Sequence, residues 1–302
     1  MNYRQIGSSD LLVSEIGLGC MSLGTDEKKA RSIIDEALDL GVNYLDTADL
    51  YDFGVNEEIV GKAIKQKRQN MILATKVGNR WETGQEGWSW DPSKQYIKEA
   101  VKKSLKKLQT DYIDLYQLHG GTIEDHIDET IQAFEELKSE GVIRYYGISS
   151  IRPNVIREFM KKSSIISVMM QYSILDRRPE EVMLEWLNTQ NISVIVRGPL
   201  AKGLLTNTWS ERIPPSGYMH LTRNELVQAL QNLKTNFTNR SIQELAFRYC
   251  LANPTIAAVI PGASSISQIR ENIHSALSTP LTKEEVHTIK RLVKADLYQE
   301  HR

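Results

Sequence analysis

Residues 71–119 contain the stretch that decides the fold: the apolar run MILATK (71–76), a segment with helical spacing, and a second apolar run, YIDLYQLH (112–119). Uniformly apolar runs of this length are typical of strands in a parallel sheet that helices cover on both sides. The segment between them is expected to open as a helix at Asp91-Pro92. Its apolar residues share one helical face: Ile97, Ala100, Val101, Leu105 and Leu108. The stretch therefore predicts a strand, a helix and a second, parallel strand.

This strand–helix unit recurs from one end of the chain to the other. Six more short runs rich in β-branched, aromatic or other apolar residues alternate with helix-period segments: EIGLGC (15–20), VNYLDT (42–47), IRYYGISS (143–150), ISVMMQY (166–172), ISVIVRG (192–198) and TIAAVIPG (255–262). Eight such strands in succession favour a closed (β/α)8 barrel, the TIM barrel of the α/β class. A capping box of Thr282 and Glu285 predicts an extra C-terminal helix. We expect residues 1–302 to form a single barrel domain.

A doubly wound nucleotide-binding sheet also alternates strands with helices and is the rival fold. Its phosphate-binding turn carries the glycine pattern G-x-G-x-x-G. The nearest stretch here contains Gly17 and Gly19, but its third glycine, Gly24, comes two positions too late. The barrel is therefore favoured.

The composition is that of an ordinary globular protein, with 41% apolar residues, 25% charged residues and a formal net charge of −1. Acidic and basic residues are interleaved, so we expect no nucleic-acid partner. No apolar run approaches the ~18 residues that a membrane span needs, and the N-terminus lacks the apolar core of a signal peptide. Cys20 and Cys250 are too few for a disulfide framework or a zinc site. We expect a cytoplasmic protein, and the sequence makes no prediction of its oligomeric state.

Two long segments interrupt the alternation, residues 79–91 and residues 206–224. Each follows a predicted strand, and active sites of barrel enzymes lie among the loops that follow strands. Trp81 and Trp88 belong to the first segment, and Trp209 belongs to the second. We expect these long active-site loops to enclose a mostly apolar cavity. Trp81 and Trp88 are candidate substrate contacts, and the alternative is that such tryptophans only anchor the loops to the barrel rim.

Four polar side chains stand at or just beyond the carboxyl ends of predicted strands. Asp46 follows VNYL, Tyr51 comes five residues later, Lys76 follows MILAT and His119 follows YIDLYQL. Each residue alone has an ordinary explanation, such as a helix cap or a solvated rim position. A barrel, however, gathers the ends of different strands around one axis. We therefore expect the four side chains to form one catalytic site.

These residue types suit the protonation of a carbonyl oxygen. A tyrosine hydroxyl is a weak acid at neutral pH, because its reference pKa is ~10. A lysine cation within hydrogen-bond reach favours the phenolate and eases proton donation, while an aspartate keeps the lysine charged and oriented. A histidine supplies a further donor to the substrate oxygen. The pattern predicts Tyr51 as general acid, supported by Lys76, Asp46 and His119.

Five stretches then resemble the signature segments of one family. NYLDTADLY (43–51), ATKVG (74–78) and DLYQLH (114–119) match the segments with the catalytic Asp, Tyr, Lys and His, and GPLAKGLL (198–205) and IPGASSISQIREN (260–272) match two cofactor segments. The chain thus resembles the bacterial aldo-keto reductases over nearly its whole length. The resemblance implies an NADPH-dependent enzyme that reduces aldehydes or ketones to alcohols by hydride transfer, with Asp46, Tyr51, Lys76 and His119 as its catalytic residues.

The resemblance also implies that the cofactor lies extended across the top of the barrel. Ser149 is expected to hold the carboxamide, the 198–205 loop to cover the pyrophosphate, and residues 262–272 to meet the adenosine end. No metal ion is expected. The full set of implied cofactor contacts is Met21, Ser149, Gln171, Arg197, Gly198, Leu200, Gly203, Leu205, Gly262, Ser264, Gln268, Glu271 and Asn272.

Three positions depart from the family pattern. Met169 replaces the usual carboxamide-binding Gln, and Gln171 is expected to substitute for it because both face the same side of the strand. Ser150 replaces the Asn that follows the matching serine. Arg197 replaces the tyrosine that stacks on the nicotinamide, so it brings positive charge beside a ring that becomes cationic on oxidation.

The adenosine segment favours NADPH over NADH. It offers donors for a 2′-phosphate, although the arginine that some relatives have at the position of Gln268 is absent. These donors are Ser264, Ser265, Gln268 and Arg270.

Two other functions fit parts of the pattern. A cofactor-bound sensor or channel-subunit-like module keeps the fold but turns over slowly, and the intact set of four residues argues against it. A metal-dependent or Schiff-base barrel enzyme would use His119 as a ligand or Lys76 as a nucleophile, but no metal-type spacing accompanies His119. We expect a small-molecule carbonyl substrate, in the range of small or medium aldehydes.

Overall fold

The computed structural model describes residues 1–82, 84 and 86–302. Its main sheet has eight parallel strands in the order β12-β11-β10-β9-β8-β5-β4-β3. Each of the eight predicted strands is present, so the strand predictions are confirmed. Their bounds are β3 (Leu18–Gly19), β4 (Tyr44–Asp46), β5 (Ile72–Val77), β8 (Ile113–Leu118), β9 (Ile143–Ser149), β10 (Ser167–Gln171), β11 (Ser193–Arg197) and β12 (Ile256–Ile260).

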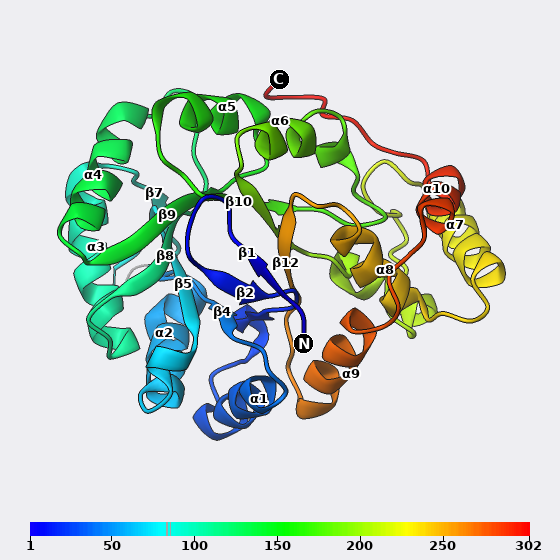
Figure 1. The fold of residues 1–302 in the computed structure, drawn as a ribbon, viewed down its shortest axis with the longest axis horizontal. Helices are drawn as coiled ribbons and strands as arrows, with labels where there is room; N and C mark the ends of the chain where they lie inside the picture. Colours follow the sequence, from blue (N-terminus) through cyan, green and yellow to red (C-terminus); the bar gives the residue numbers. More distant parts are fainter. Residues whose placement is uncertain (83, 85) are drawn as a thin grey trace.

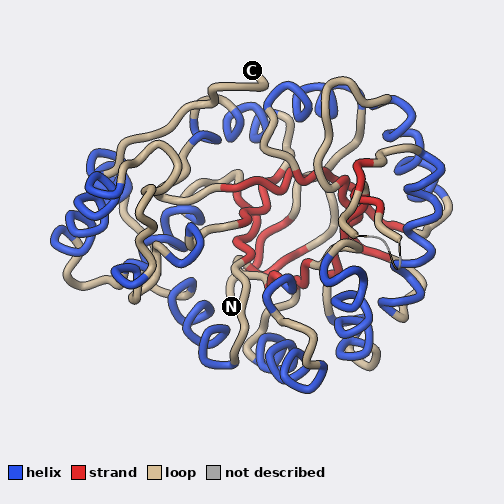
Figure 2. The backbone as a smooth tube through the Cα atoms, turned by 180° about the vertical axis from the view of Figure 1, so that it is seen from behind, coloured by secondary structure: helices blue, strands red, loops and turns tan. Residues whose placement is uncertain are grey.

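The first and last strands of the sheet meet, and the meeting closes the barrel. The amide of Gly17 donates to the carbonyl of Val259 at 2.9 Å, and the amide of Gly19 donates to the carbonyl of Pro261 at 3.0 Å. A side chain at position 17 would clash, since a Cβ there would lie 2.5 Å from Ile260 Cδ1. The strands form the closed ring seen in Figure 2. The (β/α)8 barrel is therefore confirmed, and the doubly wound rival is wrong.

Helices surround the barrel and cover the outer face of its sheet (Figure 1). They follow the strands in chain order as α1 (Glu27–Asp39), α2 (Val55–Ile64), α3 (Lys94–Leu108), α4 (Ile127–Ser139), α5 (Pro153–Lys162), α6 (Met183–Thr189), α8 (Ile242–Leu251) and α9 (Ile266–Ala276). None of the described helices is long and apolar enough to cross a membrane.

The start of α3 corrects one prediction. The helix begins at Lys94 rather than at Asp91-Pro92. Ser93 takes the capping position because its hydroxyl accepts a hydrogen bond from the amide of Tyr96 at 3.2 Å. Asp91 instead accepts from the amide of Ser93 at 3.1 Å, outside the helix.

Two further helices lie beyond the ring, where they pack against each other (Figure 1). They are α7 (Arg223–Asn236) and α10 (Lys283–Leu292). The helix α10 confirms the extra C-terminal helix predicted from Thr282 and Glu285. The helix α7 was not predicted, although Thr222 and Glu225 form the same kind of capping box.

An N-terminal hairpin of β1 (Tyr3–Gln5) and β2 (Leu12–Ser14) covers the amino ends of the barrel strands (Figure 1). Its Ile6 and Leu11 are buried in one cluster with Ile166 and Ile195 of the barrel. The hairpin therefore closes the amino end of the barrel, and a ligand must enter from the carboxyl ends of the strands.

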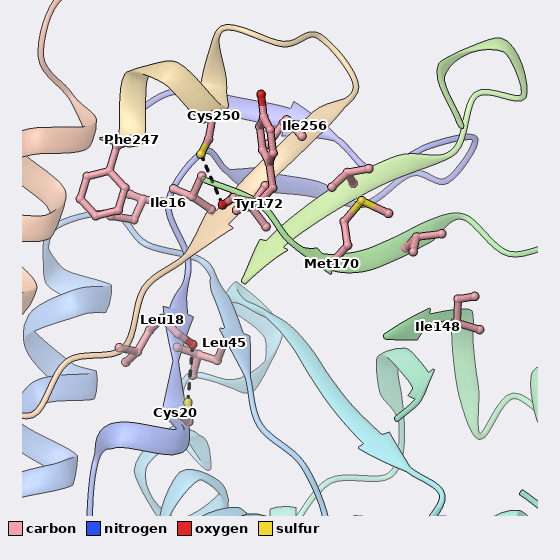
Figure 3. Close-up of a cluster of buried hydrophobic side chains, with 14 of the residues drawn as sticks. Ile16, Leu18, Cys20, Leu45, Ile148, Met170, Tyr172, Phe247, Cys250 and Ile256 are labelled. Atoms are coloured by element: carbon pink, nitrogen blue, oxygen red, sulfur yellow. Dashed lines mark hydrogen bonds between the residues drawn. The ribbon is translucent and has the colours of Figure 1, made fainter. Parts of the chain in front are cut away.

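A second and larger apolar cluster fills the space between the sheet and the helices (Figure 3). Cys20 and Cys250 belong to it and are both buried free thiols. Their sulfur atoms lie 3.7 Å from the carbonyls of Leu18 and Tyr172. They are part of the packing rather than of a reactive site.

Candidate active site

The four residues that the sequence placed at strand ends lie together at the carboxyl end of the barrel. Asp46 is the last residue of β4, Lys76 is the next-to-last residue of β5, and His119 directly follows β8. Tyr51 opens a short 3₁₀ turn, Tyr51–Gly54, in the loop between β4 and α2. Three neighbouring strands and one loop thus contribute one side chain each.

The lysine is at the centre of this group. Its Nζ donates to Asp46 Oδ1 at 2.5 Å, to the Thr47 carbonyl at 2.7 Å and to the Tyr51 hydroxyl at 3.1 Å. A lysine ammonium has three donors, so all of them are used. The amide of Gln117 donates to the second Asp46 oxygen at 3.2 Å. This network fixes the Tyr51 hydroxyl against a cation.

The Asp46–Lys76 pair is almost completely buried, with 3% and 1% of each residue exposed. Burial acts to lower the pKa of Lys76, but the Asp46 carboxylate and the Tyr51 hydroxyl outweigh it and raise that pKa above its usual value. The lysine therefore stays charged at any physiological pH. A permanent ammonium beside the phenol is the electrostatic element that a tyrosine acid needs.

His119 has a different electrostatic state. Its ring lies edge-on to the Tyr51 ring, with 6.0 Å between centroids and an interplanar angle of 84°. Burial, with the cations of Lys76 and Arg197, lowers the pKa of His119 to about 3. The imidazole is therefore neutral and has one N–H to donate.

We predict that this neutral histidine makes the protein less stable in mild acid. Because its pKa is lower in the folded than in the unfolded chain, the unfolded chain binds more protons, and stability falls as pH drops below the unfolded value of 6.5. The contribution lost between pH 7 and pH 5 is ~2 kcal/mol. Urea unfolding of wild type and His119→Asn at both pH values measures it. Equal losses in the two proteins would contradict the assignment.

The two tryptophans proposed as substrate contacts are placed differently. Trp81 Nε1 donates to the carbonyl of Asp49 at 3.0 Å, and its ring meets Phe53 edge-on at 5.7 Å, so it lies against the loop of Tyr51. Trp88 is 56% exposed and precedes β7 (Ser89–Trp90), which pairs with β6 (Asn79–Arg80). Trp81 is thus tied to the active-site loop, whereas Trp88 extends to the surface.

The residues expected at the nicotinamide end are the last residues of consecutive strands. Ser149 ends β9, Gln171 ends β10 and Arg197 ends β11. Arg197 Nη1 donates to Gln171 Oε1 at 3.1 Å, and Gln171 Nε2 donates to Asp176 at 2.8 Å. Gln171 Nε2 also donates a long hydrogen bond to the Tyr218 hydroxyl at 3.5 Å, so both donors of this amide are used and one acceptor position of Oε1 remains for a ligand. Its orientation is set by these three partners.

The substitutions at Met169 and Ser150 have clear structural consequences. Met169 is buried in the barrel interior with Ile195, two residues before Gln171 on the same face of β10. The Ser150 hydroxyl accepts from the amide of Arg152 at 3.2 Å. Both side chains therefore stabilise the protein itself, and Gln171 is the polar group at the strand end.

The 198–205 loop is shaped by glycine. Gly198 and Gly203 have φ angles of +66° and +89°, which L side chains rarely adopt. Leu205 is buried and Leu200 packs against the core, so the loop is anchored at both residues. The backbone between them is the part that can contact a ligand. Met21, also an implied contact, is 64% exposed in the 3₁₀ turn Cys20–Ser22.

The implied adenosine segment is organised around Gly262. Asn272 Nδ2 donates to the Gly262 carbonyl at 3.2 Å and its Oδ1 accepts from Gln243 at 2.9 Å. A Cβ at position 262 would lie 2.4 Å from Ser22 Oγ, so the Ser22 side chain packs directly against the backbone of Gly262 and only glycine fits there. The exposed Glu271 accepts from Asn207 at 3.0 Å, which ties the segment to the long 206–224 loop.

The expected phosphate donors are already paired within the protein. Gln268 accepts from the amide and the hydroxyl of Ser264 at 2.8 and 3.0 Å. The hydroxyl of Ser265 caps α9, and Arg270 forms an ion pair with Glu36 at 2.8 Å. A surface hollow of about 430 Å³ lies beside this segment, with Lys29 and Ser32 of α1 on its other side. The sequence reasoning missed these two residues because they come from a helix far away in the chain.

The geometry also identifies residues that the motif analysis passed over. Thr47 and Gln117 bind the two members of the Asp46–Lys76 pair. Both lie inside the quoted motifs, next to Asp46 and two residues before His119. Their position inside a family motif could have identified them from the sequence. Asp176 is fully buried, and it could not be identified in this way because its role depends on contacts with the Gln171 and Arg178 side chains, which only the structure shows.

Comparison with known proteins defines the class of this fold and site. The model of the aldo/keto reductase family matches residues 15–294, so the chain belongs to this family of NAD(P)H-dependent oxidoreductases. It is 60% identical over 306 residues to the uncharacterized oxidoreductase YqkF of Bacillus subtilis, and the alignment covers 100% of both chains. It is 30% identical to the NADH-specific methylglyoxal reductase of Escherichia coli, covering 98% of this chain and 99% of that protein.

Comparison with solved structures gives the same family. The holo form of the aldo-keto reductase AKR11C1 from Bacillus halodurans matches with a TM-score of 0.96 and 61% identity, over 100% of this chain and 99% of the other. The apo form of the same protein matches with a TM-score of 0.87 and 56% identity, over the same shares. The backbone described above is therefore more similar to the holo than to the apo form.

Proposed function

We propose that the chain reduces aldehyde and ketone carbonyls to alcohols with NADPH, and that Tyr51 is the general acid. The observation that carries the proposal is the Tyr51 hydroxyl at 3.1 Å from the Lys76 ammonium, which Asp46 holds at 2.5 Å. A general acid becomes negatively charged as it transfers its proton in the transition state. The Lys76 ammonium in contact with the phenol oxygen is placed to stabilise that developing charge.

Each of the four residues then has one task. Tyr51 donates its proton to the carbonyl oxygen as negative charge develops there. Lys76 stabilises the phenolate left behind, and Asp46 holds the lysine in position. His119, neutral in this site, donates a hydrogen bond to the same oxygen and sets its angle. Trp81 limits the space beside Tyr51 and helps to exclude water.

The nicotinamide cofactor, when bound, supplies the hydride to the carbonyl carbon. The protein offers an accessible glycine backbone for it at Gly198, which is exposed and where a Cβ would meet only Gln171 Cγ, at 3.6 Å. Ser149, Gln171 and Arg197 would hold the nicotinamide end, and the 198–205 loop would hold the pyrophosphate. The backbone is also more similar to the holo than to the apo form of AKR11C1, which supports a conformation that is ready to bind a ligand.

The direct test is absorbance at 340 nm with NADPH and a panel of aldehydes, ketones and diones. Substrate-dependent oxidation of NADPH is the expected result. NADPH binding without turnover on any carbonyl would favour a sensor-like module instead. Turnover that is independent of nicotinamide would contradict the family chemistry.

We predict that NADPH is preferred over NADH and that Gln268→Arg strengthens this preference. The variant should tighten NADPH binding by ~5- to 20-fold, because a guanidinium pairs with a phosphate dianion. It also releases the Ser264 hydroxyl, which Gln268 now binds at 3.0 Å. NADH binding, measured by the same fluorescence titration, is the internal control. If the affinities for NADPH and NADH increased equally, the 2′-phosphate would not be bound by residue 268.

Arg197 leads to a prediction about product release. Its positive charge at the end of β11 should repel the oxidised, cationic nicotinamide more than the reduced one. Arg197→Tyr is therefore expected to bind NADP+ several-fold more tightly relative to NADPH, by ~1 kcal/mol. Titration of both redox forms to wild type and variant measures the ratio. Equal or tighter relative NADP+ binding in the wild type would refute the idea.

A further inference from the structure

The first turn of α2 contains two polar side chains that are almost completely removed from solvent. Asn56 is 0% exposed and Glu57 is 1% exposed. The helix α2 directly follows the loop that bears Tyr51. Asparagine and glutamate are rarely buried without specific partners, because an unpaired polar group in the interior is costly. The hydrogen-bond partners of Asn56 and Glu57 therefore indicate the role of these two side chains.

Asn56 is connected to the residue beside Asp46. Its Oδ1 accepts from the Thr47 hydroxyl at 2.7 Å, and its Nδ2 donates to the Cys20 carbonyl at 2.8 Å. Thr47 follows Asp46 in the chain, and its own carbonyl accepts from Lys76 Nζ at 2.7 Å. Asn56 thus fixes the piece of backbone that binds the lysine.

Glu57 is connected to the residue beside Lys76. Its Oε1 accepts from the Thr75 hydroxyl at 2.7 Å. Successive residues of a strand face opposite sides, so Thr75 points outward to α2 while Lys76 points into the barrel. The second oxygen of Glu57 makes no hydrogen bond of normal geometry among the described residues, although the Ser104 hydroxyl of α3 is near enough to stabilise the carboxylate. The Thr75 bond is therefore the well-formed hydrogen bond that orients this buried carboxyl group.

The loop between these anchors has little freedom. Its beginning is held by the Asp49 amide, which donates to the Lys76 carbonyl at 3.3 Å. Asp52 and Phe53 have φ angles of 48° and 50°, in the left-handed region that L side chains avoid. Such a conformation persists only when the surrounding structure imposes it. Tyr51 lies directly before this strained pair, so its hydroxyl position depends on where α2 begins.

We propose that Asn56 and Glu57 are positioning residues for the reaction, and that their bonds to Thr47 and Thr75 hold the Tyr51 hydroxyl against the Lys76 ammonium. This inference rests on the proposed role of Tyr51 as acid. It assigns a purpose to two buried groups that touch neither substrate nor cofactor. They act through Tyr51 and Lys76.

Three matched threonine-to-valine variants test the inference. Thr47→Val and Thr75→Val each delete one hydroxyl and nearly conserve the shape. Thr255→Val makes the same change at the amino end of β12, where the hydroxyl donates to the Leu184 carbonyl at 3.2 Å. We expect kcat to fall ~10- to 100-fold in the first two, with the carbonyl KM and the NADPH Kd within about two-fold of wild type. Thr255→Val should keep its kcat.

Rescue completes the experiment, because serine restores the hydroxyl. Thr47→Ser and Thr75→Ser are expected to recover most of kcat, and thermal unfolding shows that each variant is folded at the assay temperature. Full kcat in both valine variants, an equal loss in Thr255→Val, or no recovery with serine would overturn the inference. An inactive wild type would instead contradict the proposed function. An active wild type with unaffected valine variants would contradict only the positioning role.

Discussion

Replacement of Tyr51 by phenylalanine should lower kcat by ~10²- to 10⁴-fold, the range that general acid catalysis contributes. The change removes only the oxygen that binds Lys76 Nζ at 3.1 Å and keeps the ring beside His119. NADPH affinity should be unchanged, because the hydroxyl is assigned to the carbonyl and not to the cofactor. Steady-state rates at 340 nm and fluorescence titration of NADPH measure the two quantities separately.

The matched control is Tyr145→Phe. The Tyr145 hydroxyl accepts from the amide of Asp10 in the loop of the N-terminal hairpin at 3.4 Å, at the opposite end of the barrel. Its loss should leave kcat unchanged. A Tyr51→Phe enzyme with kcat within a few-fold of wild type would show that another group donates the proton.

The second large effect is expected for Lys76→Met, which should abolish activity and also destabilise the fold. Removing one partner of a buried ion pair leaves an uncompensated charge, at a cost of ~3–5 kcal/mol. Burial raises the pKa of Asp46 above its usual value in the wild type, although Lys76 and Gln117 partly oppose it. Without the lysine the pKa should rise further, so the carboxyl of the variant binds a proton still more readily in the folded than in the unfolded chain. The variant should therefore gain stability relative to wild type as pH falls, which urea unfolding at pH 8 and pH 5 measures.

A double variant separates the two consequences of this change. Asp46→Leu in the Lys76→Met background removes the uncompensated carboxylate, so stability should largely return while activity stays lost. If Lys76→Met unfolds at the same urea concentration as wild type at every pH, the pair does not have the electrostatic role assigned here.

The barrel and the four catalytic candidates could be predicted because their signals are local. Each strand is a short apolar run, and Asp46, Lys76 and His119 each directly follow or end one. Once eight parallel strands are accepted, the barrel geometry brings those ends together without any knowledge of side-chain contacts. Tyr51 was placed through its distance of five residues from Asp46.

Features that depend on contacts between distant segments could not be predicted. The N-terminal hairpin consists of two strands of three residues, too short for a clear alternation, and it is stabilised by burial against Ile166 and Ile195. The pairing of Gln171 with Arg197 joins two strands, and the pairing of Arg270 with Glu36 joins two helices. Such partners are chosen by the folded structure, so the sequence suggested free donors where the structure has occupied ones.

The backbone contact that joins Gly17 to Val259 has a consequence for how the protein forms. Residues near the two termini must find each other before the ring is complete, and contacts of such large sequence separation slow folding. A nascent chain that still lacks β12 (Ile256–Ile260) leaves the edges of β3 and β11 unpaired, and unpaired edges invite association with other chains. Synthesis of nearly the whole polypeptide must therefore precede ring closure, and truncation before β12 should yield aggregates rather than a smaller enzyme.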